Sequence, residues 1–342
     1  MRLGWRKSEA TRSPVDRSAF DQIAALTAEN RGRRDPAIDE KLVQIRHNAF
    51  PELDATPLAV WPPAFTDPFP DVEGRPPEVT PAELTPAVLG GAIHHHGCLL
   101  VRGLFSADRA ATLVADTDRA FEARDRFEAG APASKTSPWY APFAPDPRWP
   151  ALTESQRNWV RDCGAMWIAD SPTAIYDVME GLSEARIPEL LHEYLGESPA
   201  MSVNKCTLRR VRPKASGAWH QDGSFLGPGM RTVDVWVALS ECGGDTSAPG
   251  LAMVPRRIDR VLATKLEGTA SSIAVSKTDL AGALHGQPPL RPRFAAGDAL
   301  LFDELFLHCT GGTTDKTTFR YALEAWFFAP SSFPAMYVPM AV

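Results

Sequence analysis

The chain of 342 residues is 44% hydrophobic and 23% charged, which is the composition of an ordinary globular protein. Its formal net charge of -6 argues against a protein that binds nucleic acid or an anionic membrane surface. No apolar run reaches the roughly 18 residues that a transmembrane helix needs, and the N-terminal residues lack the apolar stretch of a signal peptide. We therefore expect a soluble, cytoplasmic protein.

The cysteines indicate the same kind of protein. Their number is odd and no C-x-x-C pair occurs, so the pattern predicts neither a disulfide framework nor a structural zinc site. The five cysteines are Cys98, Cys163, Cys206, Cys242 and Cys309.

Residues 1–78 are predicted to form a proline-rich N-terminal arm that packs on the main body of the protein. A helix is predicted at 20–29. The segment 61–77 is dense in proline, which sustains neither a helix nor a central strand, so we expect it to be extended. The apolar residues that could anchor the arm are Phe50, Trp61, Phe65 and Phe69.

The first half of the main body, residues 79–197, is predicted to be mostly helical. A helix beginning at Thr80 or Thr85 should end at Gly97, and Ser106 should cap a long amphipathic helix. The predicted elements are that first helix, a strand at 98–101 and helices at 106–124, 171–182 and 183–195. Residues 129–152 form a long loop that could be part of a lid over a substrate. The loop's aromatic residues are Trp139, Tyr140, Phe143 and Trp149.

From residue 198 the pattern changes to short runs of β-branched and aromatic residues separated by Gly, Pro and Asp. Such runs predict strands at 201–212, 218–226, 231–239, 251–255, 272–275, 299–302, 306–309 and 319–328. This number of short strands is typical of a jelly roll. We therefore predict an α+β protein whose domain 79–342 has a double-stranded β-helix (jelly roll, cupin-like) core over residues 198–330, with flanking helices.

The most informative stretch is Trp219-His220-Gln221-Asp222-Gly223. On a strand, residues i and i+2 point to the same face, so the side chains of His220 and Asp222 could converge on one point. The pair is weak evidence alone, because H-x-D pairs arise by chance. His308 lies on a later apolar strand, and Arg320 follows at the start of another.

Two imidazoles and one carboxylate form the facial triad of non-haem Fe(II) oxygenases, which leaves open positions on the metal. Two of these positions can take a chelating 2-oxo acid and one can take O2. A buried arginine suits the far carboxylate of such an acid, because its planar guanidinium offers two parallel donors. Arg320 could instead be an ordinary strand arginine in a salt bridge.

Over residues 97–328 the chain resembles the phytanoyl-CoA dioxygenase family of Fe(II)/2-oxoglutarate-dependent oxygenases. Besides the H-x-D, the distal His308 and Arg320, segments in family-like order carry the resemblance. They are Cys98-Leu99-Leu100-Val101-Arg102-Gly103-Leu104-Phe105-Ser106, Leu195-Gly196, Val235-Trp236-Val237-Ala238-Leu239, Ala248-Pro249-Gly250-Leu251 and Gly297-Asp298-Ala299-Leu300-Leu301-Phe302. The resemblance implies that His220, Asp222 and His308 bind Fe(II) and that Arg320 binds 2-oxoglutarate. It further implies O2-dependent hydroxylation of a C–H bond in a small metabolite, with release of succinate and CO2.

The resemblance also implies lesser roles. Thr310 matches a position that can contact the co-substrate carboxylate, and Trp236 could wall the 2-oxoglutarate pocket or simply be core. Strand alternation places Lys205 and Thr207 on one face and Asn204 on the other, so only one set can face the pocket. Related halogenases lack the carboxylate ligand, so the presence of Asp222 favours hydroxylation.

Other polar groups are predicted to have ordinary roles. His94, His95 and His96 diverge around a helix and cannot share one ion, so we expect them to interact with the helix C-terminus. The basic stretch 209–214 could bind a phosphate, as a CoA ester would require, although a solvated strand edge is the simpler interpretation. Cys309 should face away from the metal ligands.

Two other functions stay open from the sequence. One is a metal-dependent hydrolase or isomerase that uses the same three ligands, because ligand type alone does not identify a metal. The other is a non-catalytic ligand-binding member of the fold. The aromatic residues of the arm and the loop hint at an apolar or acyl-type small-molecule substrate, and no feature of the sequence indicates an oligomeric state.

Overall fold

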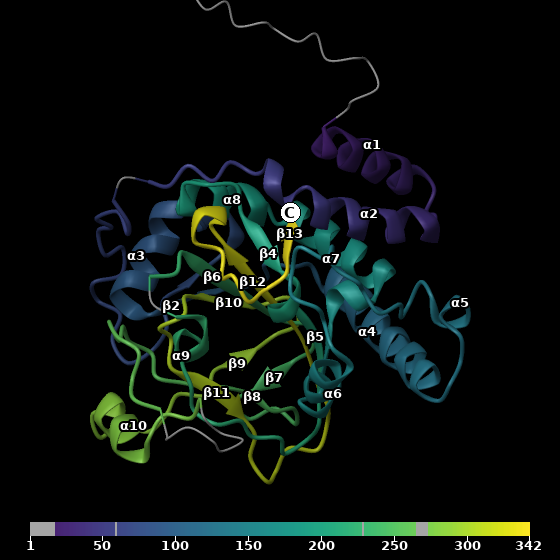
Figure 1. Ribbon diagram of the computed structural model, residues 1–342. Helices are drawn as coiled ribbons and strands as arrows, with labels where there is room; N and C mark the ends of the chain where they lie inside the picture. The colour runs from purple at the N-terminus through teal and green to yellow at the C-terminus, as the bar shows by residue number, and fades with distance from the viewer. Residues whose placement is uncertain (1–17, 59, 228, 265–272) are drawn as a thin grey trace, which may run out of the picture.

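The computed structural model describes residues 18–58, 60–227, 229–264 and 273–342, which fold into a mixed α/β structure with a large antiparallel sheet (Figure 1). The α-helices of these residues are α1 (Ala19–Gly32), α2 (Pro36–Asn48), α3 (Pro86–His96), α4 (Ala107–Glu128), α5 (Ala133–Thr136), α6 (Glu154–Asp162), α7 (Pro172–Glu184), α8 (Ile187–Leu195), α9 (Gly223–Leu226) and α10 (Lys277–Leu284). The strands are β1 (Glu78–Val79), β2 (Cys98–Val101), β3 (Ala165–Trp167), β4 (Ala200–Ser202), β5 (Thr207–Val211), β6 (Thr232–Ala238), β7 (Cys242–Gly243), β8 (Gly250–Met253), β9 (Arg293–Phe294), β10 (Ala299–Phe302), β11 (His308–Gly311), β12 (Arg320–Phe328) and β13 (Pro339–Ala341).

The described strands form one large sheet of nine strands and two small sheets of two strands each. The large sheet runs in the order β1-β2-β10-β6-β12-β4-β13, and β5 joins the same edge of β12 as β4 and carries β3. Its pairs are antiparallel except β1 with β2, which are parallel. The small sheets, β8 with β11 and β7 with β9, lie together on the opposite side of the large sheet from α7 and α8 (Figure 1).

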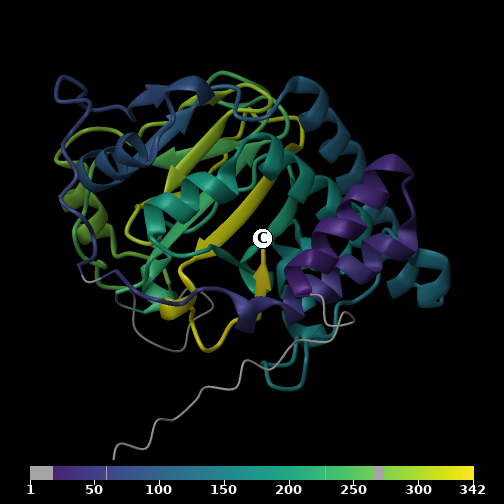
Figure 2. The same ribbon diagram turned by 90° about the horizontal axis from the view of Figure 1, so that it is seen from above.

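The two faces of the large sheet are buried against different partners. Along β12, Leu323, Ala325 and Phe327 pack in the hydrophobic cluster that includes residues of α3, α7 and α8. Successive strand residues point to opposite faces, and the alternate residues Trp326 and Phe328 pack in a second cluster that includes residues of β8 and β9. The side chains between the large and small sheets therefore form a second core, separate from the one under the helices. Figure 2 shows β12, in yellow, crossing the middle of the molecule.

Most of the predicted helices are confirmed. Thr85 caps α3 and Gly97 ends it with φ 87°, while the Ser106 hydroxyl accepts a hydrogen bond from the Arg109 amide at the start of α4. α1, α7 and α8 lie where helices are predicted. The sequence prediction did not include α2, α6 or α10.

Two predicted strands are wrong. Residues 218–226 are not one strand: the chain makes an isolated bridge at His220 and then turns into the short helix α9. Residues 201–212 are broken by a 3-10 turn, Val203–Lys205, between β4 and β5. Residue 272 of the predicted strand 272–275 lies outside the described residues, and Val275 makes only an isolated bridge to Thr264.

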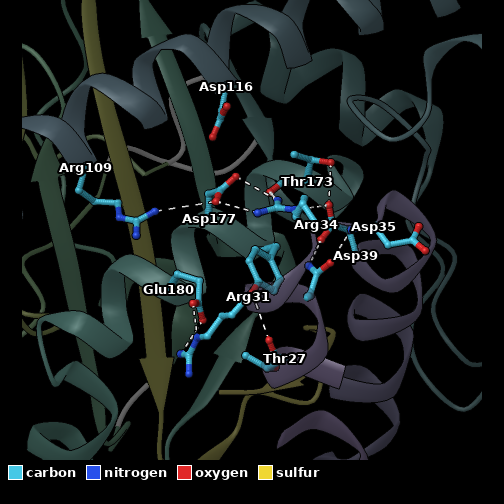
Figure 3. Close-up of polar contacts among 12 residues, drawn as sticks. Thr27, Arg31, Arg34, Asp35, Asp39, Arg109, Asp116, Thr173, Asp177 and Glu180 are labelled. Carbon is cyan, nitrogen blue, oxygen red and sulfur yellow. Dashed lines mark hydrogen bonds and ion pairs between the residues drawn. The ribbon is translucent and has the colours of Figure 1, made fainter. Parts of the chain in front are cut away.

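The hairpin of α1 and α2 is held against α7 by ion pairs (Figure 3). Arg34 donates to both carboxylate oxygens of Asp177 at 3.0 and 3.1 Å and lies 4.0 Å from the centre of the Tyr176 ring. Arg31 makes a second two-pronged pair with Glu180. Figures 1 and 2 both place this hairpin on the side of the molecule away from α10.

Residues 65–68 of the arm pack against α3, and the three consecutive histidines of α3 all contact this segment. His96 Nε2 is 2.9 Å from Asp67 Oδ1, and His95 Nε2 is 2.9 Å from the carbonyl of Phe65. The His94 ring stacks on Phe65 with the ring centres 5.5 Å apart. Phe65 also lies against Gly90, where a Cβ would be 2.4 Å from its ring. The three histidines lie in the last turn of α3, and the sequence analysis did not predict that they also contact the arm. The division at residue 78 stays a prediction.

Among the helices of the described residues, none combines the length and the apolar character needed to cross a membrane.

His47 on α2 joins the hairpin to two other parts of the chain. Its Nδ1 lies 2.7 Å from the Pro339 carbonyl, which can only accept, so Nδ1 carries the hydrogen. Its Nε2 accepts a hydrogen bond from the Asp146 amide at 3.0 Å. Burial lowers the pKa of His47, because removal from water penalises the protonated ring.

We predict that His47 makes the folded state less stable in mild acid. Its pKa is lower in the folded state than the unfolded value of about 6.5, so its contribution is present above that pH and is lost as the pH falls below it. One such group changes the free energy of unfolding by at most about 1.4 kcal/mol per pH unit. Urea unfolding between pH 7.5 and 5.5 should show a shallower pH dependence for His47→Gln than for the wild type. The exposed His192→Gln is the control, and equal slopes in all three proteins would contradict the prediction.

Candidate metal centre

The structure brings His220, Asp222 and His308 together between the large sheet and β8–β11. Their nearest ligand atoms, two imidazole nitrogens and one carboxylate oxygen, all lie within 4.8 Å of one another. In the described parts of the chain, this is the only group of three or more His, Cys, Asp or Glu side chains with such spacing.

The backbone explains the convergence. His220 and His308 exchange both backbone hydrogen bonds, at 3.0 and 3.1 Å, and their ring centres are 4.5 Å apart. Asp222 then begins α9, and its carbonyl accepts hydrogen bonds from the amides of Phe225 and Leu226. A strand–turn–helix junction, and not a continuous strand, therefore places the carboxylate beside the two rings.

Each histidine ring is held by the carbonyl two residues before it. His220 Nδ1 is 2.8 Å from the Ala218 oxygen, and His308 Nδ1 is 3.1 Å from the Phe306 oxygen. Carbonyls only accept, so both Nδ1 atoms carry hydrogen and both Nε2 atoms have a lone pair available for a metal. Burial and the neighbouring His220 lower the pKa of His308 to about 4, so this ring is neutral near pH 7.

Gln221, between the two ligands of the H-x-D, is a residue that the sequence analysis missed. Its side-chain amide donates to the carbonyls of Arg260 and Leu305 at 3.0 and 2.6 Å and accepts from the Leu262 amide at 2.7 Å. It is 1% exposed. The amide thus ties the ligand-bearing turn to two other loops, and its residue type alone carries no signal for this role.

Arg320 lies at the start of β12 and is 1% exposed. Its guanidinium donates to the Gly250 carbonyl at 2.9 Å and lies 5.6 Å from the centre of the Trp236 ring. Its Nε has no hydrogen-bond partner, and no ion pair joins it to a carboxylate of the described residues. Burial and nearby Arg209 lower its pKa to about 10, which still leaves it charged near neutral pH. The ordinary salt bridge considered from the sequence is absent from the described structure.

Trp236 and Thr310 line the same cavity as the triad, which has a volume of about 250 Å³. The predicted lid, residues 129–152, does not line this cavity in the described structure. Its Phe143 and Trp149 pack against His47 instead. The wall comes from α6 and the residues after it, which contribute Trp159, Val160, Cys163 and Ala165.

The strand alternation expected at residues 204–207 is also altered, because the 3-10 turn interrupts the strand. The Asn204 side chain turns to accept a hydrogen bond from the Val338 amide at 2.8 Å. Lys205 places its ammonium 3.4 Å from Asp222 Oδ1, and Thr207 donates to Glu324 Oε2 at 3.2 Å. Asn204, Lys205 and Thr207 all line the cavity, so the expectation that only one set can face it is wrong.

The arginines of the basic stretch 209–214 that lie on β5 are engaged with acids. Arg209 pairs with Glu324 at 2.6 Å and Arg210 pairs with Asp118 at 3.0 Å. Burial alone would raise the pKa of Glu324, but Arg209 and Lys205 lower it to about 2. These two arginines are thus not free to bind the phosphates of a CoA ester.

Comparisons with known proteins show only distant likenesses. No protein family matches the sequence, and no curated protein does. Among solved structures, AviO1 from Streptomyces viridochromogenes has 16% identity and a TM-score of 0.46, covering 71% of this chain and 94% of that one. EctD from S. alaskensis, with 2-oxoglutarate and 5-hydroxyectoine, has 19% identity and a TM-score of 0.47, covering 77% and 86%. Likenesses this remote do not assign a family or an activity.

We predict that the triad binds one divalent metal ion per chain. Removal of an outer-shell partner typically weakens metal binding by about 10- to 100-fold, so loss of a ligand in His308→Ala or Asp222→Ala should weaken it by more than about 100-fold. Anaerobic titration with Fe(II), or with Co(II) as a spectroscopic substitute, measures the affinity. His285→Ala, which removes an exposed histidine, should bind like the wild type. Equal affinity of all four proteins would place the metal elsewhere.

Proposed function

We propose that this protein is a non-haem Fe(II)- and 2-oxoglutarate-dependent oxygenase that hydroxylates a C–H bond of a small molecule. The observation that supports this most is the combination of the triad with a buried, unpaired Arg320 behind the wall of the same cavity. The ligand set suits Fe(II), because two neutral imidazoles and one carboxylate leave three positions for other ligands. The available Nε2 atoms of His220 and His308 fit that ion.

Arg320 gives the site its preference for an anionic co-substrate. A buried guanidinium without a counter-ion is costly, and the free Nε donor adds an unsatisfied hydrogen bond. The distal carboxylate of 2-oxoglutarate would supply both the charge and the acceptor. Thr310 and Trp236 would then contact the co-substrate, Thr310 through its hydroxyl and Trp236 through its ring.

The protein's own residues orient and protect the reacting groups. His220 and His308 would hold the metal with rings fixed by the Ala218 and Phe306 carbonyls, and Asp222 would neutralise part of its charge. Bound Fe(II) supplies the oxidative chemistry that couples O2 and 2-oxoglutarate to hydroxylation, releasing succinate and CO2. Phe302 and Phe306 pack against the His308 ring and exclude water from that side.

A metal-dependent hydrolase or isomerase could use the same triad, but its chemistry does not by itself require a buried arginine such as Arg320. A non-catalytic binding protein would not need three available metal ligands. The finer assignments belong to the same proposal: a jelly-roll core, a catalytic domain from residue 79, and a relationship to the phytanoyl-CoA dioxygenase family.

The first test is the visible spectrum under anaerobic conditions. Addition of Fe(II) and then 2-oxoglutarate should produce a weak metal-to-ligand charge-transfer band, because the co-substrate chelates the iron. The band should be absent from His308→Ala. A wild-type protein that binds Fe(II) and shows no band with 2-oxoglutarate would contradict the oxygenase assignment and favour the hydrolase or isomerase.

Arg320 is predicted to set the affinity for 2-oxoglutarate. A hydrogen bond to a charged group is worth about 1.5–3 kcal/mol, so Arg320→Met should raise the 2-oxoglutarate concentration for half-maximal band formation by about tenfold or more. Arg320→Lys should recover part of the loss, since it keeps the charge and loses the two-pronged geometry. Arg210→Met is the matched control. Arg210 is an arginine of β5 that pairs with Asp118 and points to the face of the sheet opposite Arg320. An unchanged titration in Arg320→Met would refute the assigned role.

A further inference from the structure

The charged side chains that line the cavity do not balance one another. Apart from the histidines and Cys163, the ionisable residues of the lining are three acids, Asp222, Asp234 and Glu324, and two bases, Lys205 and Arg209. Lys205 pairs with Asp222 at 3.4 Å, and Arg209 pairs with Glu324 at 2.6 Å. The third carboxyl group, that of Asp234, forms no ion pair within the described residues.

Asp234 is buried without a partner for one of its oxygens. It is 1% exposed, and its Oδ1 makes no hydrogen bond. Within the described residues, no basic side chain forms an ion pair with it, although Lys205 is near enough to favour its charged form. Burial, Glu324 and Asp222 raise its pKa, which is the expected behaviour of an acid that lacks a counter-ion. An unpaired carboxyl of this kind is costly unless a ligand completes it.

The position of Asp234 puts it beside Glu324. Asp234 on β6 is opposite Trp326 of β12, and Trp236 on β6 is opposite Glu324, so the two acids are diagonal neighbours on the inner face. Glu324 uses its Oε2 for both Arg209 and Thr207, and its Oε1 makes no hydrogen bond within the described structure. Both acids line one cavity, and each has an oxygen without a hydrogen bond in the described structure.

The aromatic residues of the lining suit the same kind of ligand. Phe225 and Trp236 both line the cavity, and aromatic faces attract cations. The Lys205 ammonium already lies 4.2 Å from the centre of the Phe225 ring, which shows that this part of the cavity accommodates a cation. A second metal ion is not favoured, because Asp234 and Glu324 belong to no cluster of three potential ligands in the described residues.

We propose that the substrate carries a protonated nitrogen, such as an ammonium or an amidinium, which binds at Asp234 and the free oxygen of Glu324. This inference rests on the proposed function and names its substrate class: a small cationic or zwitterionic molecule. It replaces the apolar or acyl-type substrate at which the aromatic residues of the sequence hinted.

The experiment uses the full chain loaded with Zn(II) and 2-oxoglutarate, which are diamagnetic. The probe is methylguanidinium, which coordinates metals poorly, and methylurea is its neutral counterpart of nearly the same shape. Saturation-transfer NMR at constant ionic strength measures the binding of each. The variant Asp234→Asn removes the charge with little change in volume. Asp116→Asn is the matched control, because Asp116 on α4 is also buried with an unpartnered oxygen but does not line the cavity.

We expect saturable binding of methylguanidinium and none of methylurea. Asp234→Asn should raise the Kd for methylguanidinium by about tenfold or more, since a charged hydrogen bond is lost, while Asp116→Asn should match the wild type. Equal binding of methylurea would mean that Asp234 acts as a neutral hydrogen-bonding group. That result would overturn the inference. It would also be overturned if methylguanidinium showed no saturable binding, if sodium chloride alone displaced it, or if Asp234→Asn bound it normally.

The outcomes separate this inference from the proposed function. A protein that shows the Fe(II)/2-oxoglutarate band but no Asp234-dependent cation binding keeps the oxygenase assignment and loses the substrate class. A protein that binds methylguanidinium through Asp234 but forms no band retains a cation site whose reaction must be sought elsewhere.

Discussion

The pair of backbone hydrogen bonds between His220 and His308 is the constraint on which the site depends. These two bonds hold two distant parts of the chain directly opposite each other as a hydrogen-bonded antiparallel pair. Each ring is then oriented by a carbonyl of its own segment, so neither histidine relies on a flexible side chain for its position. The third ligand needs only the turn that follows His220.

The division of the large sheet into two faces explains how the protein tolerates so many buried charges. The outer face of β12 packs with aliphatic residues of the helices, and this apolar burial is the dominant stabilising contribution. The inner face can therefore carry Arg320 and Glu324 without having to supply most of the folding free energy. Polar groups that would weaken an ordinary core are placed where ligands can satisfy them.

The sequence predicted the parts of the structure that depend on local pattern. The cap at Thr85, the left-handed Gly97 and the cap at Ser106 depend on neighbouring residues, so they could be predicted. The convergence of the triad was expected because residue types constrain metal chemistry. The backbone path that brings Asp222 to the histidines was not expected. The turn into α9 depends on long-range contacts, such as the hydrogen bond from the Gly223 amide to the Glu304 carbonyl. The position of the predicted lid and the contacts of the α3 histidines with the arm were not predicted correctly for the same reason: the partners are far away in the chain.

Gln221 shows what such long-range contacts mean for the variation of the H-x-D motif. On a strand, the side chain of the middle residue points away from the metal. Here one amide must donate twice and accept once, and its partners Arg260, Leu262 and Leu305 belong to two different loops. Glutamate lacks the donors and asparagine lacks the reach. In proteins built around the same pair of loops, this position should therefore vary as little as the ligands on either side of it, although it never touches the metal.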